Sequence, residues 1–149
     1  MALINAILKT NMRFFVTHPP DTRALLIVET LPGIDSVKKS RFKELLYGRG
    51  CSHGLLIDEQ QAVLFEETFD RPGPESIVEV RKFKTRDLLA RVDPSSFPVL
   101  EQRVAQWLNS LAAYWPDALS DETAPGLLSD IVPVLAGADV RAVYPAPVL

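Results

Sequence analysis

The chain has 149 residues, of which 47% are hydrophobic and 23% are charged, a mixture typical of a folded protein and not of a disordered chain. The length suits one domain, so we expect a single domain over residues 1–149. A net charge of -3 excludes a strong global attraction to polyanions. Residues 1–93 hold 14 Lys and Arg against 13 Asp and Glu, whereas residues 94–149 hold 2 against 6.

Cys51 is the only cysteine, which excludes an internal disulfide and a cysteine-rich zinc site. Residues 1–8 are apolar but lack the preceding positive charge and the cleavage site of a signal peptide. No apolar run approaches the roughly 18 to 20 residues of a membrane helix. We therefore expect a cytoplasmic protein that does not contact a membrane.

The N-terminal part predicts two strands and a helix. Residues 2–9 suit a short helix or an entry strand, and the aromatic run at 12–16 suits a strand. After two prolines, the continuous apolar run at 23–30 (RALLIVET) predicts a central strand buried on both faces. Asp35 or Ser36 then caps a helix that we expect to run to about Tyr47.

Residues 53–59 and 61–68 predict a hairpin, and the alternating run at 76–83 predicts a strand at the sheet edge. The remainder is expected to be mainly helical. We predict helices at 86–91, 98–114 and 126–135, and a last strand at 139–144. The fold class is thus α/β or α+β: a mixed sheet of about five strands flanked by helices, with residues 12–85 as the core and 86–149 as a C-terminal extension.

The order of a strand carrying a carboxylate, a basic helix, a glycine linker and the hairpin HGLLIDEQQAVLFEE resembles the core of the PD-(D/E)xK nucleases, especially the N-terminal domain of type I restriction subunits. This resemblance covers residues 12–85 and implies a restriction-endonuclease-like fold. It matches Pro20-Asp21 to the first motif element and Glu29-Thr30-Leu31 to the second. In active members two carboxylates bind Mg²⁺ and a lysine assists the attacking water.

The lysine position of this motif is occupied by Leu31, which can neither orient water nor offset phosphate charge. An active nuclease would therefore need Asp21 and Glu29 as metal ligands and a relocated lysine, for which Lys38 is the local candidate. The structural alternative is that Glu29 points to solvent or accepts hydrogen bonds from the following loop, and that Asp21 is a turn residue. Without a nuclease reaction no cofactor is expected.

Two further groups of residues suggest binding. Basic side chains on the first helix and just beyond it suit either a solvated surface or contact with a nucleic-acid backbone. Aromatic and apolar residues in the C-terminal part suit either core packing or an interface. The first group is Lys38, Lys39, Arg41, Lys43 and Arg49; the second is Trp107, Trp115, Val148 and Leu149.

Cys51 and His53 stand two residues apart at the start of a strand, and His18 lies in the proline loop. A nucleophile with its base also needs a third orienting group and an oxyanion site, which the sequence does not supply. We interpret Cys51 as a small buried residue and His53 as the first residue of the strand.

Three functions remain open. The leading hypothesis is a nuclease-like domain without catalysis that acts as a binding or assembly module, with a protein partner or a second copy of the chain. The second is an active Mg²⁺-dependent nuclease with nucleic acid as its substrate. The third is a protein-interaction module unrelated to nucleases.

Overall fold

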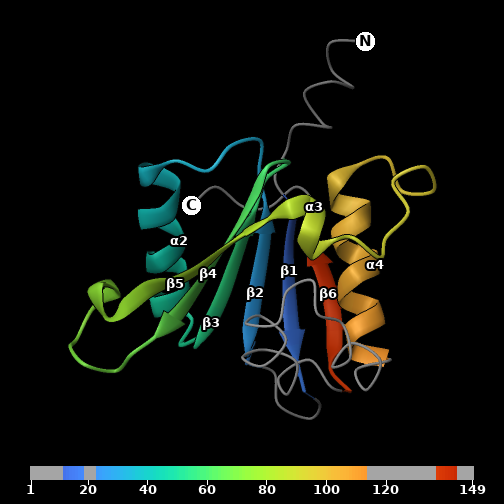
Figure 1. The fold of residues 1–149 in the computed structure, drawn as a ribbon. Coiled ribbons are helices and arrows are strands. Elements are labelled where there is room, and N and C mark those ends of the chain that lie inside the picture. Colours follow the sequence, from blue (N-terminus) through green and yellow to red (C-terminus); the bar gives the residue numbers. More distant parts are fainter. Residues whose placement is uncertain (1–11, 19–22, 114–136, 144–149) are drawn as a thin grey trace.

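The computed structural model describes residues 12–18, 23–113 and 137–143. These residues form an α+β fold, in which one six-stranded mixed sheet lies between helices (Figure 1). The elements are β1 (Met12–Thr17), β2 (Leu26–Thr30), α2 (Ser36–Gly48), β3 (His53–Ile57), β4 (Gln61–Glu67), the 3-10 turn η1 (Pro74–Ser76), β5 (Ile77–Lys84), α3 (Thr85–Leu88), α4 (Leu100–Ala113) and β6 (Asp139–Val143).

The strands lie in the order β5-β4-β3-β2-β1-β6. Only β2 and β3 are parallel, and α2 is the connection between them. The other neighbouring pairs are antiparallel. Because β2 and β3 occupy the middle of the sheet, both strands are buried almost throughout.

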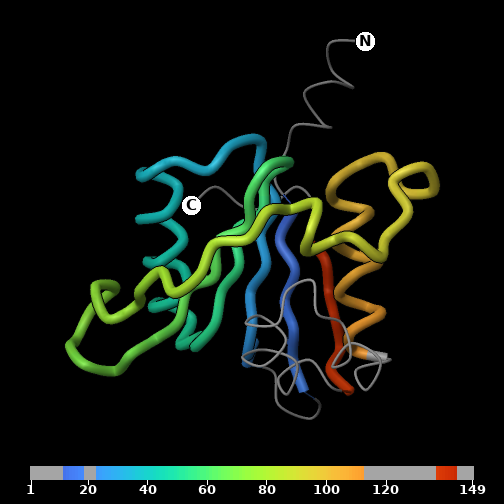
Figure 2. The backbone as a smooth tube through the Cα atoms, viewed as in Figure 1, coloured from blue at the N-terminus to red at the C-terminus, as the bar shows by residue number. Residues whose placement is uncertain are grey.

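Each face of the sheet has its own hydrophobic core, because successive side chains of a strand point to opposite faces. Helix α2 packs on one face, where Phe42 and Leu46 meet Leu56 and Phe65. Helices α3 and α4 pack on the other face. Figure 2 traces the chain from β5 through α3 to α4, which lies beside β6.

Local sequence explains where α2 begins and how closely it packs. The side chain of Asp35 accepts a hydrogen bond from the Lys38 backbone N–H at 2.8 Å, as an N-cap residue does. Gly54 on β3 lets the helix approach the sheet: a Cβ atom there would lie 2.6 Å from side-chain carbons of Phe42 and Leu46. The sheet and helix contact each other through this glycine.

The predicted elements within the described residues are confirmed, with shifts of a few residues at their ends. The 23–30 strand is central, the 53–68 hairpin forms, and β5 lies at a sheet edge as expected. The last predicted strand is present as β6 and brings the sheet to six strands. The expected elements at 2–9 and 126–135 lie outside the described residues.

Candidate functional site

Glu29, the carboxylate singled out by the sequence, is buried within the sheet and forms an ion pair. It stands directly opposite Arg13 in the antiparallel register of β1 and β2. The Arg13 Nε lies 2.7 Å from Glu29 Oε1, and the side chains are 2% and 1% exposed. The expectation that Glu29 points to solvent is wrong, because its position inside β2 places it between Arg13 and Leu56 of the neighbouring strands.

Leu31, at the lysine position of the nuclease motif, belongs to the hydrophobic core beneath α2. Its side chain is 3% exposed, and its backbone N–H donates to the Ile57 carbonyl at 3.0 Å. The chain therefore uses this position for packing. A lysine ammonium here would be drawn out of water, at a cost that few buried lysines offset.

Of the remaining residues of the predicted nuclease site, only Lys38 belongs to the described part of the chain. Asp21 lies outside the described residues. Lys38 lies in the first turn of α2 and is half-buried. Among the described residues, no three His, Cys, Asp or Glu side chains form a group that could hold a metal ion.

The basic residues of α2 make contacts within the chain. Lys39 pairs with Glu79 of β5, with Nζ 3.3 Å from Oε2. The ammonium of Lys43 lies 5.9 Å from the ring centre of Phe65, and the guanidinium of Arg49 lies 4.9 Å from that of Phe15. Arg41 is exposed to solvent, whereas Lys39 and Lys43 contact residues of the sheet.

Cys51 and His53 do not act on each other through their reactive atoms. The Cys51 thiol lies 3.2 Å from the His53 backbone carbonyl, and burial raises the pKa of this thiol to about 11. The His53 ring instead lies between Ser52 Oγ, 2.9 Å from Nδ1, and Glu66 Oε1, 3.2 Å from Nε2. The interpretation of a buried cysteine and a histidine that begins the strand is confirmed.

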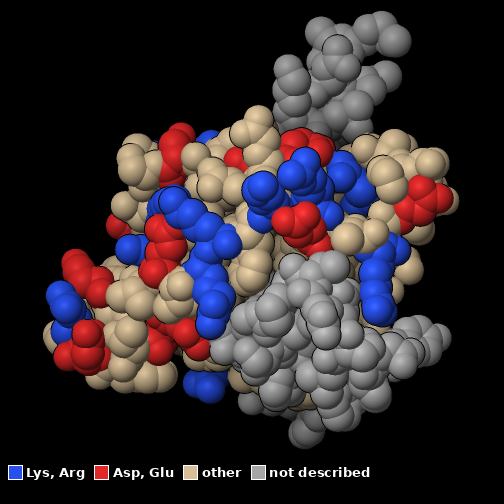
Figure 3. All heavy atoms as spheres, in the orientation of Figure 1, with Lys and Arg blue, Asp and Glu red and all other residues tan. Residues whose placement is uncertain are grey.

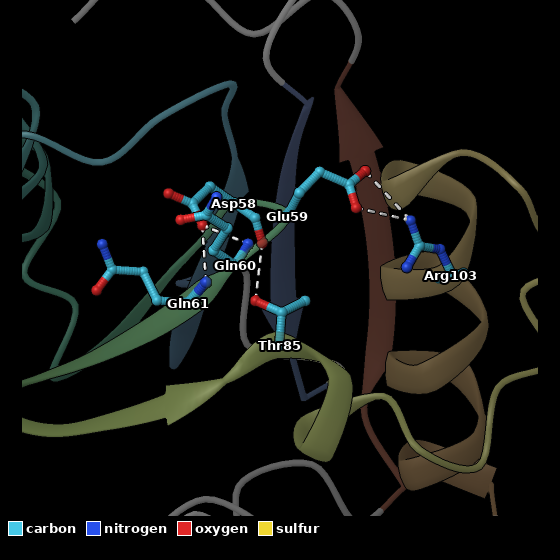
Figure 4. Close-up of polar contacts among 6 residues, drawn as sticks. All are labelled: Asp58, Glu59, Gln60, Gln61, Thr85 and Arg103. Atoms are coloured by element: carbon cyan, nitrogen blue, oxygen red, sulfur yellow. Dashed lines mark hydrogen bonds and ion pairs between the residues drawn. The ribbon is translucent and has the colours of Figure 1, made fainter.

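Asp58 joins several elements, a role that sequence reasoning missed (Figure 4). Its Oδ1 accepts hydrogen bonds from the backbone N–H groups of Gln60 and Gln61, and its Oδ2 accepts one from Ile34. Its backbone carbonyl accepts from the Thr85 hydroxyl at 2.8 Å. The only sequence signal is an Asp at the start of a hairpin turn, which indicates a local bond but not the contact with the loop before α2.

The neighbouring Glu59 extends this contact region toward α4. Its carboxylate lies 3.1 Å from an Arg103 guanidinium nitrogen (Figure 4). The turn of the β3–β4 hairpin is thus tied to the loop before α2, to the start of α3 and to α4. Its polar groups serve the fold.

Trp107, predicted as either core or interface, is 8% exposed and belongs to the core between α4 and the sheet. Trp115, Val148 and Leu149 lie outside the described residues. No helix of the described part of the chain is long and apolar enough to cross a membrane.

Comparison with protein-family models, with curated proteins and with solved structures gave no match.

Proposed function

We propose that this protein is a nuclease-like domain that does not cleave nucleic acid and acts as a binding or assembly module in the cytoplasm. One observation carries the proposal: the carboxylate at the motif position, Glu29, is buried and bound to Arg13. A metal ligand needs oxygen atoms that an incoming ion can reach. Leu31 in the core adds support, because the motif lysine is replaced by a packing residue.

The expected partner of such a module is a protein or a second copy of the chain. A domain that does not catalyse a reaction acts by binding, so we propose a partner in place of a substrate. Sedimentation equilibrium of the full chain over a hundredfold concentration range tests self-association. A mass that stays at the 16.5 kDa of one chain throughout would leave a protein partner as the proposed target.

The absence of cleavage is tested by incubating the purified chain with plasmid DNA, single-stranded DNA and RNA in Mg²⁺ and in Mn²⁺. We expect no product above that of a mock purification. Cleavage that needs the metal and disappears in Glu29→Gln would overturn the proposal and support an active nuclease. Since Glu29→Gln alters a buried ion pair, circular dichroism must show that the variant is folded.

A second variant, Lys38→Ala, accompanies that experiment because Lys38 is the proposed relocated lysine and its replacement leaves the buried ion pair intact. The relocated-lysine hypothesis predicts that Lys38→Ala abolishes metal-dependent cleavage, whereas Arg41→Ala, which removes an exposed cation of α2, retains it. Cleavage that survives in both Glu29→Gln and Lys38→Ala would indicate a contaminating nuclease.

A further inference from the structure

A surface cavity of about 570 Å³ lies at the C-terminal end of α2, beside the loop between β4 and β5. It contains no residue of the predicted nuclease, nucleic-acid or interface sites, and Cys51, which lines it, was interpreted from the sequence as a buried residue. Its lining includes two aromatic residues, Tyr47 and Phe69, and three charged residues, Glu67, Asp70 and Arg71.

Two exposed aromatic side chains line this cavity. Phe69 is 81% exposed and Tyr47 is 45% exposed, so both present ring surface to solvent. A ring face attracts cations because its π electrons carry partial negative charge. An aromatic residue exposed to this extent gains little from folding and is typical of a binding surface.

The loop holds Phe69 in an unusual backbone conformation. Its φ of 58° lies in the left-handed region, which costs a residue with a Cβ about 1 kcal/mol. Three hydrogen bonds fix this geometry: the Phe69 N–H donates to Glu67 Oε1 at 2.9 Å, and the N–H and hydroxyl of Thr68 reach the Ser76 carbonyl at 2.9 and 2.6 Å. The loop therefore holds the backbone of Phe69 in a defined conformation.

Carboxylates outnumber cations in the cavity lining. The charged residues that line it are Glu67, Asp70 and Arg71, a net charge of -1 (2 minus 1), and the Nε of the exposed Arg71 lies 3.5 Å from Asp70 Oδ1. Figure 3 shows red acidic atoms with blue basic atoms among them at this end of the molecule, at the lower left of the view. The Thr68 hydroxyl, which is shared between Asp70 and the Ser76 carbonyl, and the neighbouring Arg71 lower the pKa of Asp70 below its usual value.

We propose that this cavity binds an arginine or lysine side chain presented by a protein partner, with the cation held against the rings of Tyr47 and Phe69 and balanced by Glu67 and Asp70. The charge decides between occupants: an apolar anchor would need no carboxylates, and an anionic one would be repelled by them. The inference rests on the proposed binding function and names the chemistry of its partner.

The test is a titration of the ¹⁵N-labelled full chain with a blocked triarginine peptide, followed by two-dimensional NMR. We expect shifts concentrated at residues 47, 50–52 and 67–73. The control peptide carries citrulline in place of each arginine, which keeps the shape and removes the charge. We expect it to bind at least about tenfold more weakly, since a cation–π contact and carboxylate pairing both require the charge.

Variants locate the site. Phe69→Ala and Tyr47→Ala are each expected to weaken triarginine binding at least about fivefold. Phe69→Gly removes the ring while suiting the left-handed φ, so it keeps the loop folded if Phe69→Ala does not. Val37→Ala is the matched control, because Val37 is also an exposed apolar residue, 56% exposed, on α2 away from the cavity lining.

Three results would overturn the inference: no binding at millimolar peptide, equal binding of the citrulline peptide, or full binding by Phe69→Gly and Tyr47→Ala. These results are independent of the cleavage assay. If the peptide does not bind and the chain does not cleave nucleic acid, only the proposed cation site is rejected. If the chain shows metal-dependent cleavage, the proposed function is rejected, whatever the peptide titration shows.

Discussion

At the scale of single residues, Arg13 and Glu29 form an ion pair that is buried between β1 and β2. Both side chains are almost fully buried, and they face each other across β1 and β2. A buried pair of this kind gains little over apolar residues of similar size, because each ion loses its hydration. Removing only one partner is costly, because the other charge stays in the interior.

Replacement of Glu29 by alanine is therefore expected to destabilise the fold by about 3 to 5 kcal/mol. Arg13 would lose its carboxylate partner within the sheet. Urea unfolding of the wild type and of Glu29→Ala, monitored by circular dichroism, measures the change.

The double variant Arg13→Met/Glu29→Leu is the control for that prediction. It removes both charges and keeps apolar volume, so we expect it to recover most of the lost stability. A double variant as unstable as Glu29→Ala would show that loss of the ion pair itself, and not the charge left behind in the interior, causes the effect.

Cys51 makes stability depend on pH in the alkaline range. Burial raises the pKa of the thiol from 9.0 to about 11, so the folded state holds this proton more tightly than the unfolded state does. The contribution to stability is complete below pH 9 and is lost as the pH rises toward 11. The loss amounts to about 2 to 3 kcal/mol at the upper end.

Urea unfolding between pH 8 and 11 measures this dependence, with Cys51→Ala as the reference that removes the thiol. We expect the free energies of unfolding of the two proteins to converge as the pH rises. A constant difference over this range would contradict a raised pKa. The neutral buried thiol should also react slowly with iodoacetamide at pH 8.

The packing of α2 on β3 depends on the absence of a side chain at Gly54. A methyl group at this position would meet Phe42 and Leu46, both fully buried, at 2.6 Å. Gly54→Ala is expected to cost about 1 to 3 kcal/mol, because the helix must shift or the core side chains must leave their rotamers.

Gly33→Ala is the matched control, since no atom lies within 4 Å of its would-be Cβ and its φ is not in the left-handed region. We expect a change within about 0.5 kcal/mol, or a slight gain in stability. Thermal unfolding of both variants compares them directly. Equal losses would indicate that the glycines matter for backbone freedom and not for the contact between helix and sheet.

The β3–β4 turn depends on Asp58. Replacement by alanine leaves the backbone N–H groups of Ile34, Gln60 and Gln61 without their carboxylate acceptor, which we expect to cost about 2 to 4 kcal/mol. Asp58→Asn keeps one acceptor oxygen and should lose less. Urea unfolding of these variants measures the losses, with Glu59→Ala as the control at the exposed neighbouring carboxylate. An unchanged free energy of unfolding in Asp58→Ala would contradict the role assigned to this carboxylate.

Across the molecule as described, the central strands should be the most protected. Strands β2 and β3 are paired on both sides and covered on both faces, whereas β5 has a neighbour on one side only. Hydrogen exchange is expected to be slowest at amides of β2 and β3 and faster along β5. Equal protection of β5 and β2 in the isolated chain would contradict the strand order.

The sequence was sufficient to predict the elements but not the way in which they meet. The apolar run of β2 and the Asp35 cap are local signals, and they located a central strand and the start of α2. Glu29 was found because a carboxylate in a buried strand is rare. Its partner was not found, because the pairing of Arg13 with Glu29 depends on the β1–β2 register, which no local pattern specifies.

The same reason explains why the cavity beside Phe69 was missed. Its lining comes from the end of α2, the start of β3 and the loop after β4, which are separate in the sequence. Phe69 is exposed and has a left-handed backbone, whereas composition predicts only that the segment is a loop rich in proline and glycine.

The buried ion pair also constrains how the chain assembles during folding. If β1 slid by two residues along β2, Arg13 would face Ile27 or Leu31, and both charges would be enclosed without each other. A slide by one residue would put them on opposite faces of the sheet. We therefore expect misaligned pairings of β1 and β2 to be higher in free energy than the native register. The ion pair would then contribute more to the choice of register during folding than to the stability of the folded protein.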